Sequence, residues 1–166
     1  MTYIDKSELF QEIATKLTEK GFKIESEDQN RPWGGFFVIN EDQAQEFANA
    51  YFEGMDVQDL KISGKLSPKV LIVGPNKRLS WQYHHRRAEI WRVIRGEVGV
   101  VTSPTDEEHE LKILKEGDSI RLSQGERHRL VGLGSYGVVA EIWQHTDSAN
   151  PSDEEDIVRV QDDFGR

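Results

Sequence analysis

The feature that most constrains the fold is a change of pattern at Leu60. From there to the C-terminus, short runs rich in β-branched and aromatic residues alternate with turn signals, which is typical of an antiparallel sandwich or barrel. The expected strands cover 60–63, 68–74, 79–84, 89–95, 97–103, 109–115, 118–122, 127–131, 137–144 and 156–160. This pattern predicts an all-β protein, an antiparallel jelly-roll β-barrel whose interior can hold a metal and one small ligand.

A helix is expected over residues 7–20, before the strands begin. Ser7 is a suitable N-cap, an apolar stripe follows at helical spacing, and Gly21 provides a stop. We expect this helix to pack on the outside of the domain. Residues 22–24 are predicted as a short strand and residues 25–30, which are polar, as a loop.

A second helix is expected over residues 40–53, after a β-rich run at 35–39. Asn40 and Gln43 are spaced as a capping box, and the apolar residues that follow recur at helical spacing. Its aromatic stripe is interpreted as packing first, with a dimer contact or a narrowed barrel mouth as alternatives.

Four side chains have the spacing of a metal site. Gln82 and His84 lie two residues apart, so on a strand they leave the same face. Glu89 follows five residues after His84, which allows a tight bend and a return on a neighbouring strand. His128 follows a later turn and can supply a fourth ligand. Nitrogen and oxygen ligands of this kind suit a divalent metal of borderline hardness.

These residues carry a resemblance to the cupin superfamily. The first cupin motif is matched by Gly74, His84, Glu89 and Gly96, and the second by Gly117, Gly125 and His128. Ser123 stands where the second motif usually has proline, and Gly132 where it has asparagine. Neither departure touches an expected ligand.

The closer resemblance is to the C-terminal isomerase domain of type II mannose-6-phosphate isomerases. Its Arg-Pro-Trp-Gly opening is matched at 31–34, its core at 79–91 except at Trp81, Arg86 and Ile90, and its tail at 156–159 and 163–166. The resemblance covers residues 29–166, which implies a cupin barrel there and an N-terminal helical extension over residues 1–28. The helix at about 41–53 departs from the family pattern as an insertion.

The resemblance implies a site and a reaction. The expected metal ligands are Gln82, His84, Glu89 and His128, with zinc as the first candidate and manganese, iron, cobalt or nickel as alternatives. Arg87 and Arg166 match family arginines, the first resembling a residue needed for isomerisation and the second one that closes over substrate. Glu141 matches a family glutamate and is a candidate for the base that moves a proton between C1 and C2, with Lys77 as its rival.

Basic residues gather in sequence around the expected ligands. They are Lys77, Arg78, Arg86, Arg87 and Arg129. Guanidinium groups bind oxyanions bidentately, so this cluster is a candidate phosphate or enediolate clamp, although solvated strand ends are the simpler interpretation of each residue taken singly.

Composition limits the partners. A net charge of −9 over 166 residues argues against nucleic acid and anionic membranes, which need a basic face. With no cysteine, no signal-peptide run and no long apolar segment, we expect a cytoplasmic protein. A homodimer is expected by resemblance only.

The sequence therefore predicts a metal-dependent isomerase of a sugar phosphate, with mannose 6-phosphate as the first candidate substrate. An isomerase of a free aldose such as lyxose or mannose is one alternative. A non-catalytic sugar-binding cupin is the other.

Overall fold

The computed structural model describes residues 5–55 and 65–165. The expected strand at 60–63 and Arg166 lie outside the described residues. The helices are α1 (Lys6–Glu19) and α2 (Ala44–Tyr51), the latter preceded by a 3-10 turn, Glu41–Gln43. The strands are β1 (Ile24–Arg31), β2 (Gly34–Ile39), β3 (Lys69–Val73), β4 (Trp81–Tyr83), β5 (Arg87–Arg95), β6 (Glu97–Ser103), β7 (Lys112–Lys115), β8 (Ser119–Leu122), β9 (Arg127–Gly132), β10 (Gly137–His145) and β11 (Val158–Gln161).

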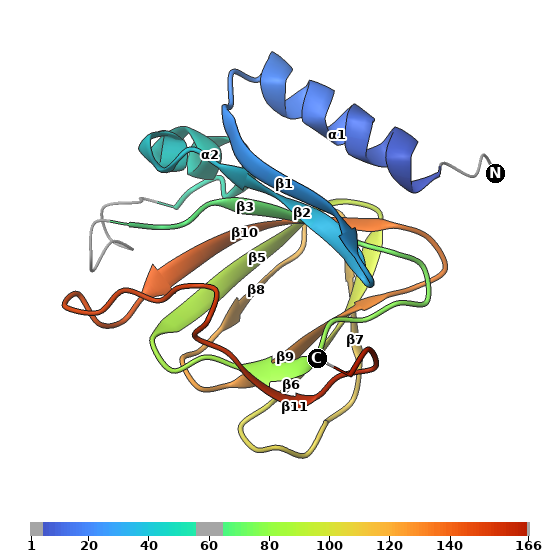
Figure 1. Ribbon diagram of the computed structural model, residues 1–166, viewed down its shortest axis with the longest axis vertical. Coiled ribbons are helices and arrows are strands. Elements are labelled where there is room, and N and C mark those ends of the chain that lie inside the picture. Colours follow the sequence, from blue (N-terminus) through green and yellow to red (C-terminus); the bar gives the residue numbers. More distant parts are fainter. Residues whose placement is uncertain (1–4, 56–64, 166) are drawn as a thin grey trace.

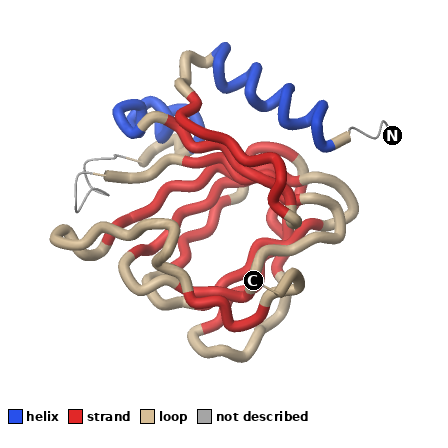
Figure 2. The backbone as a smooth tube through the Cα atoms, in the orientation of Figure 1, coloured by secondary structure: helices blue, strands red, loops and turns tan. Residues whose placement is uncertain are grey.

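The strands form two facing antiparallel sheets, one ordered β1-β2-β3-β10-β5-β8 and the other β11-β4-β9-β6-β7 (Figure 1). Every ladder between neighbours is antiparallel. Both helices lie against the outer face of the larger sheet, away from the smaller one (Figure 2). The predicted all-β, cupin-type jelly-roll with two added helices is confirmed.

Strand alternation divides the apolar residues between two cores. On β10, Val138, Ala140 and Ile142 face the helices, whereas Val139 packs in the cluster between the sheets. Because successive side chains of a strand point to opposite faces, Glu141 has the same inward parity as Val139. Polar groups at such positions therefore enter the space between the sheets, where a site can form.

The N-terminal segment differs from its prediction in two places. Asp5, not Ser7, caps α1, because its carboxylate accepts the amide of Glu8 at 2.8 Å and Ser7 lies already inside the first turn. Residues 25–30 are strand rather than loop, because β1 pairs with β2 along its length. The ladder satisfies the backbone while polar side chains face solvent, so pairing overrides local composition.

The capping box predicted at the second helix is also wrong. The side chain of Asn40 accepts the amide of Asp42 at 2.8 Å. Gln43 instead bonds the amide of Lys23 and the carbonyl of Gly21, at 2.7 Å each. It therefore fastens the start of the helix to the turn that precedes β1.

The N-terminal helical extension predicted over residues 1–28 does not end at a break in the structure, because β1 runs continuously through residue 28.

Among the described residues, no helix combines the length and the apolar character needed to span a membrane.

Candidate metal centre and adjoining pocket

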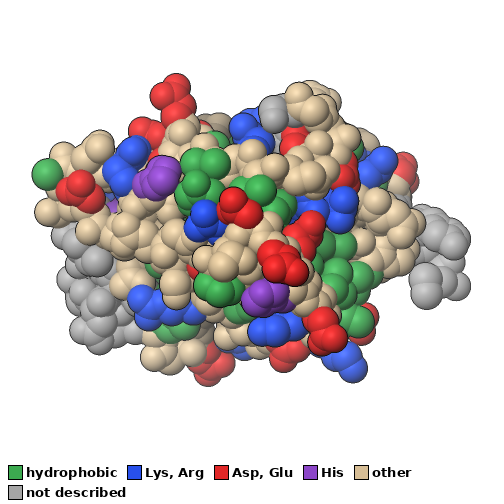
Figure 3. Space-filling model, turned by 90° about the horizontal axis from the view of Figure 1, so that it is seen from below, with side chains coloured by type: hydrophobic (Ala, Val, Ile, Leu, Met, Phe, Trp, Pro, Cys, Tyr) green, Lys and Arg blue, Asp and Glu red, His purple; other side chains and the backbone are tan. Residues whose placement is uncertain are grey.

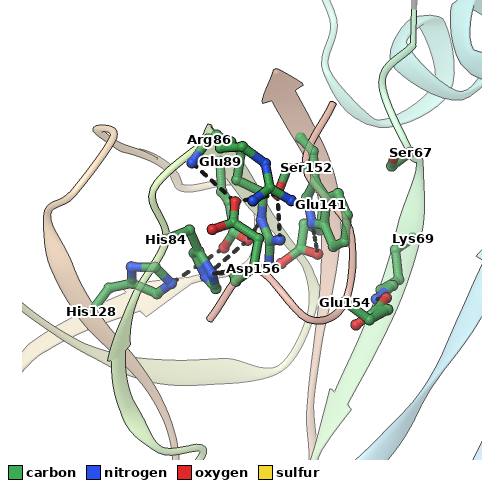
Figure 4. Close-up of polar contacts among 12 residues, drawn as sticks. Ser67, Lys69, His84, Arg86, Glu89, His128, Glu141, Ser152, Glu154 and Asp156 are labelled. Atoms are coloured by element: carbon green, nitrogen blue, oxygen red, sulfur yellow. Dashed lines mark hydrogen bonds and ion pairs between the residues drawn. The ribbon is translucent and has the colours of Figure 1, made fainter. Parts of the chain in front are cut away.

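Three predicted metal ligands converge between the sheets. His84 directly follows β4, Glu89 lies on β5 and His128 on β9, and all three are buried. One donor atom from each lies within 4.8 Å of the others (Figure 4). The spacing predicted a bend after His84 and a return on a neighbouring strand. The bend is present, but it carries the chain from the smaller sheet to the larger one, so Glu89 on β5 faces His84 across the space between the sheets.

Backbone carbonyls fix the orientation of both imidazoles. His84 Nδ1 lies 2.6 Å from the carbonyl oxygen of Asp156, and His128 Nδ1 lies 3.1 Å from that of Glu126. A carbonyl only accepts, so each Nδ1 carries the proton and each Nε2 presents its lone pair. The Nε2 atoms lie 3.5 Å and 3.3 Å from the carboxylate oxygens of Glu89. Such outer hydrogen bonds are the usual way of orienting metal-binding histidines.

The residues fit a divalent cation. Glu89 Oε1 and His128 Nε2 are buried and have no hydrogen-bond partner among the described residues. With Nδ1 protonated, these atoms face each other lone pair to lone pair, an arrangement that a cation between them satisfies. Burial lowers the pKa of His84 to about 4, which keeps its imidazole in the neutral form that binds metals.

The charge of Glu89 is also fixed by its surroundings. Burial by itself raises the pKa of this carboxyl, but the positive charge of Arg87, followed by the interactions with His84 and His128, outweighs burial and holds the pKa well below its usual range. The carboxylate is therefore the form present at neutral pH.

Gln82 lies beside this group. It is opposite His128 in the β4–β9 pairing, is buried and lines the adjoining cavity. Its amide oxygen accepts the hydroxyl of Ser80 at 2.5 Å. A role as fourth ligand stays a prediction.

Arg87 connects the metal-binding group to the C-terminal segment. Its Nε donates to Glu89 at 2.9 Å, and a terminal nitrogen lies 3.3 Å from His84 Nε2. Another terminal nitrogen donates to Ser152 Oγ at 2.9 Å. The guanidinium carbon lies 3.6 Å from the ring centroid of Trp143. The side chain is thus held on every side while it faces the ligands.

The segment between β10 and β11 holds the turn that carries His84. The carboxylate of Asp156 accepts the backbone amides of His85 and Arg86, both at 2.9 Å, and the hydroxyl of Ser152 at 2.6 Å. Because the carbonyl of Asp156 also accepts His84 Nδ1, one residue orients both the ligand and the turn behind it. Sequence reasoning missed this role, since the partners lie about 70 residues apart.

A cavity of about 140 Å³ adjoins the metal-binding group. Its buried wall includes Glu89, Trp91, Glu141 and Trp143. The carboxylate of Glu141 accepts both indole N–H groups, each at 2.7 Å. Burial, and then the charge of Glu89, raise the pKa of Glu141 from its ordinary value of 4.5 to about 7. The cavity thus contains an acid–base group poised near neutral pH.

Besides Arg87, three further cations line the same cavity: Arg31, Lys69 and Arg159. Sequence reasoning assigned none of them to the site. Lys69 was detectable, because it shares strand parity with Leu71 and Val73, which pack in the core between the sheets. The two arginines come from distant strands and only folding brings them here.

The basic cluster predicted from the sequence is largely dispersed. Arg78 pairs with Asp163, and the charge of Arg86 lies 3.5 Å from that of Asp153. Arg129 is fully buried and lies 3.1 Å from the carboxylate of Glu108. Lys77 is exposed and lines a different cavity, so the structure does not bring it to the site. Of that cluster, only Arg87 lines the cavity beside the metal-binding group.

The exposed face seen from below mixes acidic and basic side chains (Figure 3). The chain is acidic overall, with a net charge of −9. Against this background, the cations around the cavity are a local feature of the site.

Comparisons with known proteins place these features in a family. The sequence model described as "Mannose-6-phosphate isomerase C-terminal" matches residues 40–162. The xanthan biosynthesis protein XanB of Xanthomonas campestris pv. campestris is 31% identical over 136 residues, which are 82% of this chain and 23% of that protein. The mannose-1-phosphate guanylyltransferase ManC of Salmonella typhimurium is 34% identical over 99 residues, 59% of this chain and 19% of that protein. The chain thus spans about a quarter or less of the length of these curated relatives.

Solved structures are similar in fold only. A recombinant oxalate oxidase in complex with glycolate superimposes with a TM-score of 0.52 at 18% identity, covering 80% of this chain and 58% of that one. The capsular polysaccharide assembling protein CapF from Staphylococcus aureus superimposes with a TM-score of 0.52 at 14% identity, covering 84% of this chain and 34% of that one.

Proposed function

Because the chain belongs to the family of mannose-6-phosphate isomerase C-terminal domains, we propose that it is a metal-dependent aldose–ketose isomerase of a sugar phosphate. Conversion of mannose 6-phosphate to fructose 6-phosphate is the first candidate reaction. The observation that carries the proposal is a single cavity lined by Glu89 of the metal-binding group, by Arg87 and by Glu141. Isomerisation needs these elements together: a ligand site for a Lewis acid, a positive charge and a proton carrier.

His84, Glu89 and His128 would hold the metal, with Gln82 as the proposed fourth ligand. Bound there, a divalent metal would supply Lewis-acid polarisation of a carbonyl or hydroxyl oxygen. Zinc is the first candidate because the ligands are imidazole and carboxylate, and manganese, iron, cobalt and nickel are the alternatives. A homodimer and a cytoplasmic location stay predictions.

Glu141 is the proposed proton carrier. Its carboxylate takes a proton from one of the two reacting carbons and returns it to the other, and a pKa of about 7 suits a group that must both accept and release a proton. The indoles of Trp91 and Trp143 hold the carboxylate in place without consuming its second lone pairs.

Arg87 is the proposed stabiliser of the oxyanion that develops as the proton moves. Its planar guanidinium is fixed by Glu89, Ser152 and Trp143, so little reorganisation accompanies the reaction. Arg166, which lies outside the described residues, is proposed from the resemblance alone to close over the substrate.

The test is turnover on mannose 6-phosphate beside free mannose and lyxose, after reloading the protein in turn with zinc, manganese, cobalt and nickel. Glu141→Gln and Arg87→Gln should each lower kcat by at least about 100-fold while metal content is retained. Lys77→Met is the matched control, since Lys77 is exposed and lines another cavity, and it should turn over like the wild type.

Turnover with the phosphorylated sugar alone supports the proposal. Turnover with a free aldose supports the alternative isomerase. Metal-loaded protein that turns over none of the three sugars contradicts an isomerase of these substrates and favours a sugar-binding cupin.

A further inference from the structure

The geometry points to an anion subsite in the wall of the cavity, formed by Lys69, Arg31 and Arg159. We infer that it takes the phosphate of the substrate, and that Glu154 occupies it in the free protein as an internal stand-in for that phosphate. The inference rests on the proposed function only for the sugar to which the phosphate is attached.

Lys69 is a buried cation that faces the cavity. It pairs with Glu141 across β3 and β10, so both side chains leave the sheet on its inner face. Its side chain is 8% exposed, and its ammonium lies 4.7 Å from the ring centroid of Phe36 and 5.0 Å from that of Trp143. A charge buried to this extent needs an anionic partner.

That partner is Glu154, on the segment between β10 and β11. Its carboxylate lies 2.5 Å from Lys69 Nζ, and the two side chains point toward each other in Figure 4. The side chain of Glu154 is 68% exposed, in contrast to that of Lys69. When the carboxylate of Glu154 moves away from Lys69, it is hydrated by solvent, so its departure costs little free energy. The buried ammonium of Lys69 still needs an anionic partner. Exchange of Glu154 for another anion therefore costs little free energy.

The exchange needs only a side-chain rotation. Ser152 and Asp156, on either side of Glu154, are buried and bonded to each other and to the turn behind His84. The backbone of the segment is therefore anchored while the carboxylate between the anchors is free to swing into solvent.

Two further cations complete the subsite. The guanidinium of Arg31 lies 5.4 Å from the Phe36 ring, which Lys69 also contacts, and is 3.1 Å from Asp28. Arg159 is exposed, and within the described part of the chain its side chain has no hydrogen bond or ion pair. An ammonium and two guanidinium groups suit a dianionic phosphate, which presents three equivalent oxygens.

The Lys69–Glu154 pair also stands between two cavities. Lys69, Trp143 and Glu154 line both the cavity beside the metal-binding group and a second cavity of about 440 Å³ outside it. A ligand whose phosphate displaces Glu154 is therefore placed at this boundary, with the rest of the molecule directed inward toward Glu89.

The test is binding of inorganic phosphate to the full chain, measured by calorimetry at fixed ionic strength and with equal metal content in all variants. Glu154→Gln removes the internal competitor and should tighten binding about fivefold. Lys69→Met removes the cation at similar length and should weaken binding at least about tenfold. Glu155→Gln is the matched control: it makes the same change of net charge one residue away, on an exposed side chain, and should bind like the wild type.

Thermal unfolding keeps the test independent of folding defects. Glu154→Gln should lower Tm without phosphate, because Lys69 loses its partner, and should gain more in Tm on adding phosphate than the wild type does. The inference is overturned if Glu154→Gln binds phosphate no better than Glu155→Gln, or if Lys69→Met binds like the wild type. Since no turnover is measured, phosphate binding with this pattern in a protein inactive on every sugar would uphold the subsite while refuting the isomerase.

Discussion

Asp156 should be the side chain on which the metal-binding turn most depends. Its carboxylate accepts three hydrogen bonds, two at 2.9 Å from the consecutive amides of His85 and Arg86 and one at 2.6 Å from Ser152. Each buried donor left without an acceptor costs roughly 1–3 kcal/mol. Asp156→Ala should therefore lower the free energy of unfolding by about 3–5 kcal/mol, allowing for partial hydration of the turn. This is a large share of the roughly 5–15 kcal/mol that stabilises a typical domain.

Two variants calibrate the measurement. Asp156→Asn keeps one acceptor oxygen and the shape of the side chain, so it should lie between the wild type and the alanine variant. Glu155→Ala changes an exposed neighbour and should stay within about 0.5 kcal/mol of the wild type. Urea unfolding of metal-free protein at neutral pH gives the three values.

The loss of unfolding free energy in Asp156→Ala should depend on pH. Burial raises the pKa of Asp156, but its hydrogen bonds from Ser152, His85 and Arg86 outweigh burial and leave the pKa below its usual value. A carboxyl with a lowered pKa contributes stability above its unfolded pKa and loses it as pH falls through the folded one. The gap between wild type and Asp156→Ala should therefore narrow in acid. A gap at neutral pH no larger than that of Glu155→Ala would refute the reasoning.

Three other perturbations have expected outcomes. Burial raises the pKa of Glu141 from 4.5 to about 7, so between these pH values the folded state binds a proton that the unfolded state does not, and the free energy of unfolding falls as pH rises. In Glu141→Gln the free energy of unfolding should vary less with pH over this window. An unchanged slope would contradict a buried carboxyl at this position. Glu89→Ala should abolish cobalt binding, as measured by the visible spectrum of the bound cobalt. It should also destabilise the metal-free protein by about 3–5 kcal/mol, because the buried guanidinium of Arg87 loses its carboxylate partner. A metal-free variant as stable as the wild type would contradict this expectation. Gly132→Ala should be poorly folded by circular dichroism, since a Cβ there would lie 1.8 Å from the carbonyl oxygen of Gly74, whereas Gly134→Ala, with nothing within 4 Å, should fold normally.

Local sequence was sufficient to predict features that depend on the two-residue period of a strand and on short spacings along the chain. The predicted strand at 97–103 matches β6 in both bounds, and the inward parity of Glu89, Trp91 and Val93 follows from alternation alone. His84 and Glu89 were identified from a short spacing that allows a bend between two strands, and His128 from the turn before it and its match to the second cupin motif. The structure brings the three together across facing sheets, with β4 and β9 in one sheet and β5 in the other.

The misassigned elements are those stabilised by distant partners. Residues 25–30 have the composition of a loop, and only pairing with β2 makes them a strand. The basic cluster near the ligands was a sequence neighbourhood rather than a spatial one. Strand alternation and turns place Lys77 in the wall of another cavity, and of the basic cluster only Arg87 lines the cavity beside the metal-binding group.

The sequence by itself determined the two-sheet fold, the family and the three side chains that converge on a metal, because these depend on a strand period and on short spacings along the chain. The tertiary structure alone decided what surrounds them. Lys69 meets Glu154 and Arg159 at one cavity, and Asp156 holds the turn behind His84, although Lys69 and His84 lie at least 70 positions before this C-terminal segment. Contacts of that kind depend on which strands become neighbours in the sheets, and no local pattern of residue types specifies that.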